Sequence, residues 1–145
     1  MKLEERVNRG IWKVLTPIFP ALQHTLLRLR VIRHKGRQPY LLGYLRPGAT
    51  FDQLKAHLAK QGFGNHFIAW SDTDQILSWR KRTSFNEQYH IRFFKDGEIR
   101  GHYEYTPEGH PLDHFYEVGQ TERREKFLEY LGDWVVQQKP MKVKH

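Results

Sequence analysis

The sequence predicts an α+β protein, in which an N-terminal helical arm, residues 1–38, precedes a single globular body, residues 39–145. Apolar residues recur at helical spacing in the arm, and several later segments alternate in the manner of strands. Short turn sequences join most of these strands, and strands joined in this way pair antiparallel. We therefore expect a mainly antiparallel sheet of about five strands, with helices packed on one face.

The arm is predicted to contain a helix that begins at Thr16-Pro17, a cap residue followed by proline in the first turn. One face of this helix carries an apolar stripe and another an arginine stripe: Leu22, Leu26 and Leu29, and Arg30, Arg33 and Arg37. Such a helix can dock on the body, lie on an anionic membrane surface or bind nucleic acid. Gly36 and Pro39 mark the joint to the body.

The body is predicted to begin with a strand over residues 40–45, a turn and then a helix. Thr50 and Gln53 have the spacing of a capping box, in which each side chain bonds the other residue's backbone N–H. Gly62 is a candidate left-handed stop for this helix. The four strands expected after it cover residues 66–71, 75–82, 87–94 and 98–106. Residues 107–119 read as irregular, and Thr121 is a candidate cap for a final helix that buries Phe127, Leu131 and Trp134.

The hairpin of residues 87–106 allows a more detailed prediction, because the apolar residues of both strands occupy odd positions. Facing residues of an antiparallel pair share one side of the sheet, so their numbers must have an even sum here. A three-residue loop, Lys95-Asp96-Gly97, meets this condition, and Gly97 stands where such a loop needs a left-handed residue. A two-residue loop would mix apolar and charged residues on both faces.

This register places a polar patch on the opposite face of the hairpin. His90 faces His102, Arg92 faces Arg100, and Glu104 faces a glutamine. Two histidines beside arginines suit phosphodiester chemistry, because one imidazole takes a proton, the other gives one, and the arginines hold the developing charge. The alternative is that this is the ordinary solvent-facing side of an antiparallel sheet.

A metal site is the less favoured interpretation of the histidine-rich segment. His102, Glu104, His110, Asp113 and His114 lie close together in the sequence, but Pro111 interrupts the helical spacing that zinc ligands often use. We therefore expect no bound metal and no cofactor.

Composition and charge limit the classes of function. The chain has no cysteine, which excludes disulfides, thiolate metal sites and cysteine nucleophiles. No stretch reaches the roughly 18 apolar residues of a membrane span, and no secretory signal is visible, so we expect a soluble cytoplasmic protein. Residues 1–50 hold ten basic and two acidic residues, whereas residues 51–145 hold fourteen of each, so the net charge of +8 comes from the first third. Such a basic segment is typical of polyanion binding, although a merely solvated surface has the same composition.

Three functional hypotheses follow. The first is a polyanion-binding domain, with nucleic acid as the expected ligand, that uses the basic arm and the polar sheet face. Its expected binding residues are Arg28, Arg30, Arg33, Lys35, Arg37, Arg80, Arg82, Arg92 and Arg100. The second is a small hydrolase or nuclease with His90 and His102 as the acid–base pair and Glu104 in support. The third is a structural or adaptor domain whose arm docks on a protein partner or, as a peripheral contact, on a membrane surface.

Overall fold

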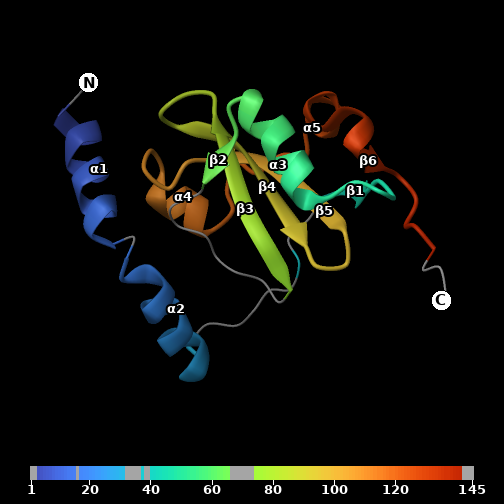
Figure 1. Ribbon diagram of the computed structural model, residues 1–145. Helices are drawn as coiled ribbons and strands as arrows, with labels where there is room; N and C mark the ends of the chain where they lie inside the picture. The colour runs from blue at the N-terminus through green and yellow to red at the C-terminus, as the bar shows by residue number, and fades with distance from the viewer. Residues whose placement is uncertain (1–2, 16, 32–36, 38–39, 66–73, 142–145) are drawn as a thin grey trace.

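A computed structural model confirms the α+β fold, and it describes residues 3–15, 17–31, 37, 40–65 and 74–141. Six strands form one antiparallel sheet in the order β2-β3-β4-β5-β1-β6 (Figure 1). The strands are β1 (Leu41–Leu45), β2 (Gly64–Asn65), β3 (Gln75–Arg82), β4 (Glu87–Phe94), β5 (Glu98–Tyr105) and β6 (Val135–Val136). The helices are α1 (Leu3–Leu15), α2 (Phe19–Arg28), α3 (Phe51–Lys60), α4 (Pro111–Phe115) and α5 (Arg124–Leu131), with a 3-10 turn at Gly132–Trp134.

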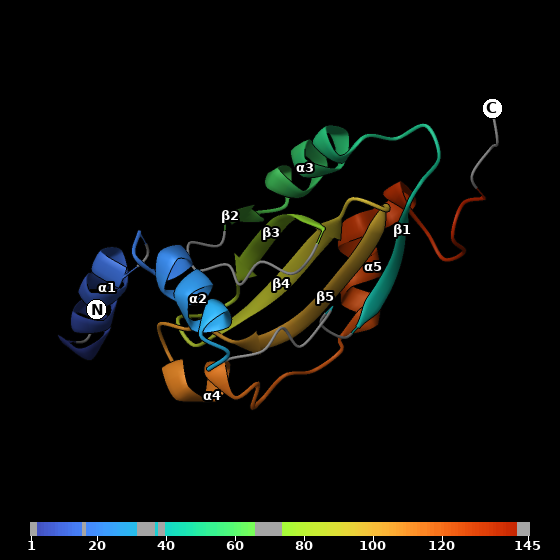
Figure 2. The same ribbon diagram turned by 90° about the horizontal axis from the view of Figure 1, so that it is seen from below.

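One face of the sheet forms the apolar core. Tyr89, Ile91 and Phe93 of β4 lie on this face, each no more than 5% exposed. Helices α3 and α5 pack against the same face through fully buried side chains: Leu54, Leu58, Phe127 and Leu131. Helix α4 lies on the other side of the strands from α3, and it contacts β5 (Figure 2).

The hairpin register agrees with the prediction at every pair. His90 faces His102 and Arg92 faces Arg100, so facing numbers have the expected even sum. The N–H of Gly97 donates to the carbonyl of Phe94 at 3.0 Å, and Gly97 has a φ of +88°, as the three-residue loop requires. The sequence pattern alone therefore identifies which residues share a face.

Local signals succeeded at both ends of α3 and failed at the starts of α2 and α5. Thr50 and Gln53 form the predicted capping box, and Gly62 has a φ of +89°. The prediction for Thr121 is wrong: its backbone pairs with Tyr103, and α5 begins three residues later, at Arg124. Residues 107–119 also contain the short helix α4 rather than irregular chain alone.

Two other predicted features concern residues outside those described. The predicted strand over residues 66–71 falls there, and the described chain instead gives β2 at Gly64–Asn65. Thr16 is likewise outside, but Pro17 is described, and the prediction that it opens the helix is wrong: Pro17 lies in a turn, and α2 begins at Phe19 with Pro20 in its first turn.

The two arm helices extend to one side of the sheet in both views (Figures 1 and 2). Helix α1 leaves an apolar stripe exposed, since Leu3, Val7, Ile11 and Val14 are between 49% and 78% exposed. In α2, Leu22 is also exposed, whereas Gln23 is buried. Among the described residues, no helix has the combination of length and apolar content that crossing a bilayer requires.

Candidate functional site

The polar face of the hairpin is buried, and this differs from the solvent-facing sheet that the alternating pattern also allowed. His90, Arg92, His102 and Glu104 are 3%, 6%, 2% and 7% exposed. Strand β3 extends the same face, because Arg80 pairs with His90 across the sheet and is itself 8% exposed. Buried polar groups need partners within the protein, so this face must form a hydrogen-bonded network.

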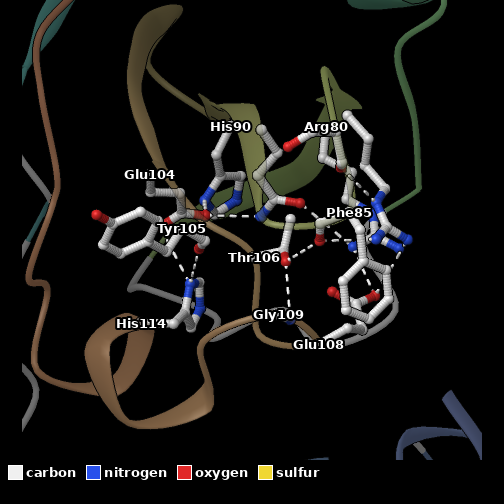
Figure 3. Close-up of polar contacts among 12 residues, drawn as sticks. Arg80, Phe85, His90, Glu104, Tyr105, Thr106, Glu108, Gly109 and His114 are labelled. Atoms are coloured by element: carbon white, nitrogen blue, oxygen red, sulfur yellow. Dashed lines mark hydrogen bonds and ion pairs between the residues drawn. The ribbon is translucent and has the colours of Figure 1, made fainter. Parts of the chain in front are cut away.

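Glu104 lies at the centre of that network, between His90 and His102, and Figure 3 shows its side chain beside that of His90. Its Oε2 accepts a hydrogen bond from His102 Nε2 at 2.8 Å, and its Oε1 lies 3.1 Å from His90 Nδ1. Gln88 donates to Oε1 at 2.8 Å, and the other nitrogen of His90 lies 2.5 Å from the hydroxyl of Ser78. The two imidazole rings meet edge to face, with centroids 5.0 Å apart.

The electrostatic environment gives His90 and Glu104 different charge states. Burial lowers the pKa of His90 to about 3, and the attraction of Glu104 offsets this only in part. Burial also acts to raise the pKa of Glu104, but the charges and hydrogen bonds of His102 and His90 outweigh it and hold that pKa well below its usual value. At neutral pH the site therefore holds a neutral His90 beside an ionised carboxylate.

A second carboxylate continues the network through a loop that approaches the polar face. Arg80 donates to Glu108 at 2.9 Å and to Gln88 at 3.2 Å, which links Glu108 to the Glu104 cluster. Glu108 is 1% exposed. Thr106 positions this loop, because its hydroxyl donates to the carbonyl of Phe85 at 2.5 Å and accepts from the N–H of Gly109 at 3.0 Å (Figure 3).

Helix α4 closes one side of the cluster. His114 donates from Nδ1 to the carbonyl of Tyr105 at 2.7 Å, and the same nitrogen lies 3.5 Å from Glu104 Oε2. The side chain of His114 is 24% exposed, whereas that of Glu104 is 8% exposed. The buried carboxylate of Glu104 therefore has a partly exposed side chain, His114, as a neighbour.

The predicted binding arginines divide into two groups. Those of the sheet face are buried or paired with carboxylates: Arg100 bonds Glu98, and the side chain of Arg82 is 28% exposed and 3.9 Å from Glu108. Arg37 also pairs with acids, at 2.8 Å from Asp96 and 3.0 Å from Glu98. Arg28 and Arg30 are exposed on the arm, and Arg33 and Lys35 lie outside the described residues.

Sequence reasoning missed Ser78 and Glu108 as members of the site, whereas the hairpin register had already placed Gln88 opposite Glu104. Ser78 and Arg80 share the polar side of β3 by alternation, so pairing β3 with the hairpin would have brought Ser78 beside His90. No comparable signal exists for Glu108, since the loop that carries it has no period.

Comparison of the chain with known protein families, with curated proteins and with solved structures finds no match.

Proposed function

We propose that this protein binds a polyanion through its basic N-terminal arm, residues 1–38, with nucleic acid as the expected ligand. The observation that carries the proposal is the contrast between the cations of the arm and those of the sheet face. Among the described arm residues, Arg6, Lys13, Arg28 and Arg30 are exposed. Exposed Lys and Arg side chains neutralise phosphates and release the counterions that surround them.

The sheet face contributes less to this function than the sequence suggested. Arg80 is buried against Glu108, and Arg100 pairs with Glu98. A guanidinium that is buried beside a carboxylate must lose that partner before it can contact a phosphate, and breaking a buried pair is costly. The proposed binding surface is therefore the arm.

A specific observation favours an anionic lipid surface as a second candidate ligand. The exposed stripe of α1 is apolar, and Val7, Ile11 and Val14 recur on it at helical spacing. An amphipathic helix with cations beside an apolar stripe can lie in a membrane interface, where burial of the stripe adds to the attraction of anionic headgroups. Nucleic acid offers phosphates but little apolar surface to such a stripe.

The hydrolase hypothesis remains a proposal, and the environment of His90 argues against that residue as the general acid. A general acid must carry a proton near neutral pH, whereas His90 has a pKa of about 3. Both imidazoles are also at most 3% exposed, so a substrate would have to displace whatever covers them.

A fluorescence-anisotropy titration of the full chain with labelled single-stranded and duplex DNA tests the main proposal. Binding should weaken steeply as salt rises, with a slope of about 0.9 in log affinity for each phosphate neutralised on a duplex. The double variant Arg28→Ala/Arg30→Ala should bind more weakly and lower this slope by nearly two such contacts. Binding that is absent at low salt, or indifferent to salt, would overturn the proposal for nucleic acid.

A matched control and a lipid titration make the test specific. Arg37→Ala removes a cation that Asp96 and Glu98 already neutralise, so it should change DNA affinity little. The pair Ile11→Ser/Val14→Ser should leave DNA binding intact and weaken binding to vesicles that contain phosphatidylserine. If the vesicles bind tightly while DNA does not, the lipid surface is the ligand of the arm.

A further inference from the structure

The geometry points to a binding site for a divalent transition-metal ion, with His90, His102 and Glu104 as its protein ligands. This inference is independent of polyanion binding by the arm, and it departs from the sequence-based expectation of no metal. Each of the three residues offers one ligand atom, and these atoms all lie within 4.8 Å of one another. Within the described part of the chain, this is the one group of metal-ligating side chains with that geometry.

The sheet itself sets this arrangement. His90 of β4 and His102 of β5 are directly opposed, and Glu104 follows two residues later on the same face. Two ligands bound to zinc at about 2.0–2.2 Å stand roughly 3.4 Å apart in a tetrahedral site. Glu104 Oε1 lies 3.1 Å from His90 Nδ1 and Oε2 lies 2.8 Å from His102 Nε2. An ion would replace the proton that each of these contacts shares, and it would draw together ligand atoms that already lie within 4.8 Å of one another.

The surrounding residues match what metal-bound histidines and carboxylates usually have around them. A histidine that ligates through one nitrogen commonly donates its other N–H to a neighbouring oxygen, which fixes the ring orientation. His90 turns Nδ1 toward Glu104 and lies 2.5 Å from the Ser78 hydroxyl through Nε2. Gln88 holds the carboxylate in the same way, by donating to Glu104 Oε1 at 2.8 Å.

The ligand set defines the class of ion. Two imidazoles and one carboxylate suit zinc and other first-row divalent ions, whereas magnesium and calcium prefer oxygen ligands alone. Three protein ligands leave a further coordination position for water or a small ligand. His114 Nδ1 lies 3.5 Å from Glu104 Oε2, and its side chain is 24% exposed.

Isothermal titration of the chelator-treated full chain with Zn²⁺ tests the inference. We expect one ion per chain in the wild type, and loss of that binding in Glu104→Gln and His102→Ala. Ser78→Ala, which removes only the oxygen beside His90, should weaken binding by about 10–100-fold. The matched control is His110→Ala, since His110 has an equivalent carboxylate neighbour, Asp113 at 3.4 Å, but its side chain is 37% exposed and lies outside the cluster.

A second readout keeps the test decisive if His102→Ala fails to fold. Co²⁺ added to the wild type should give the visible absorption of nitrogen and oxygen coordination, and Glu104→Gln should lose it. Zn²⁺ should also raise the melting temperature of the wild type and of His110→Ala, but not that of Glu104→Gln, because only binding to the folded state stabilises it. The inference is wrong if neither ion binds the wild type saturably, or if Glu104→Gln binds as well as the wild type does.

Discussion

The two faces of the β4–β5 hairpin are equally buried but are filled with opposite chemistry. On one face Ile91 and Phe93 are each 1% exposed and belong to the hydrophobic core cluster. On the other face His90 and His102 are 3% and 2% exposed and lie within a chain of hydrogen bonds that runs from Ser78 to Glu108. A single pair of strands therefore separates an apolar core from a buried polar network.

The two faces should therefore respond to substitutions in different ways. A large-to-small substitution on the apolar face lowers the free energy of unfolding by an amount that grows with the atoms removed and the cavity left behind. A buried polar network instead depends on mutual satisfaction, so removing one member leaves its partner desolvated without compensation. Removal of both partners can then be less harmful than removal of one.

Breaking the network at Glu108 is the largest expected effect. Glu108→Leu should lower the free energy of unfolding by about 3–5 kcal/mol, because it leaves the buried Arg80 without its carboxylate. The double variant Arg80→Met/Glu108→Leu should recover a substantial part of that loss, since no buried charge is then left uncompensated. Urea unfolding followed by circular dichroism measures both variants.

An exposed ion pair provides the control for this prediction. Lys126 and Glu129 lie 2.7 Å apart on α5, with side chains 48% and 64% exposed. Glu129→Leu should change stability far less than Glu108→Leu does, because solvent screens an exposed pair and such pairs contribute little. If Glu108→Leu were equally mild, or if the double variant were no better than the single one, the polar face would not depend on mutual satisfaction.

Acid should weaken the polar face before it affects the apolar one. The pKa of His90 is about 3 in the folded protein and near 6.5 in the unfolded chain, so between these values the unfolded state binds one more proton. Its contribution to stability is complete above pH 6.5 and falls by roughly 1.4 kcal/mol per pH unit as the pH drops toward 3. Glu104 acts in the same direction at lower pH, because its pKa is depressed in the fold.

Urea unfolding of the chelator-treated protein at a series of pH values measures this slope. Other histidines titrate in the same range, so the variant His90→Gln is the reference. The charged and titratable groups that face His90 include Glu104, Arg92, His102 and Arg80, and all of them remain in the variant. As the pH falls, the free energy of unfolding of the wild type should decrease faster than that of the variant, by roughly 1.4 kcal/mol per pH unit, which corresponds to one proton. Parallel curves would show that His90 takes up its proton in the folded state.

How much of this could be predicted from sequence depends on whether a signal was local or periodic. The capping box at Thr50 and the turn at Gly97 are local, and both are confirmed. The face assignment of His90 and His102 is periodic, and it is also confirmed. Thr121 fits a local cap signal as well, but its backbone pairs with Tyr103 instead, and this long-range pairing was invisible in the sequence.

Burial of the polar face could not be predicted, because alternation reports which residues share a side and not what covers that side. The sequence therefore predicted which hairpin residues lie together on the polar face, but not that these residues are buried. Glu108 shows the limit most clearly. It reaches Arg80 from 28 positions along the chain, through a loop whose shape depends on the Thr106 hydroxyl.

The apolar face offers the smallest and most local test, at Gly101. This residue faces Ile91, and an added Cβ would lie 2.9 Å from Leu42 Cδ1 and 3.0 Å from Phe127 Cε1. Gly101→Ala should therefore destabilise the fold by about 1–3 kcal/mol through overpacking, measured by urea unfolding. Gly10→Ala in α1 is the control, since nothing lies within 4 Å of its added Cβ, and it should instead raise the helix content of the arm. A harmless Gly101→Ala would show that the apolar face has room to adjust, and the contrast with the polar network would then lie in chemistry alone.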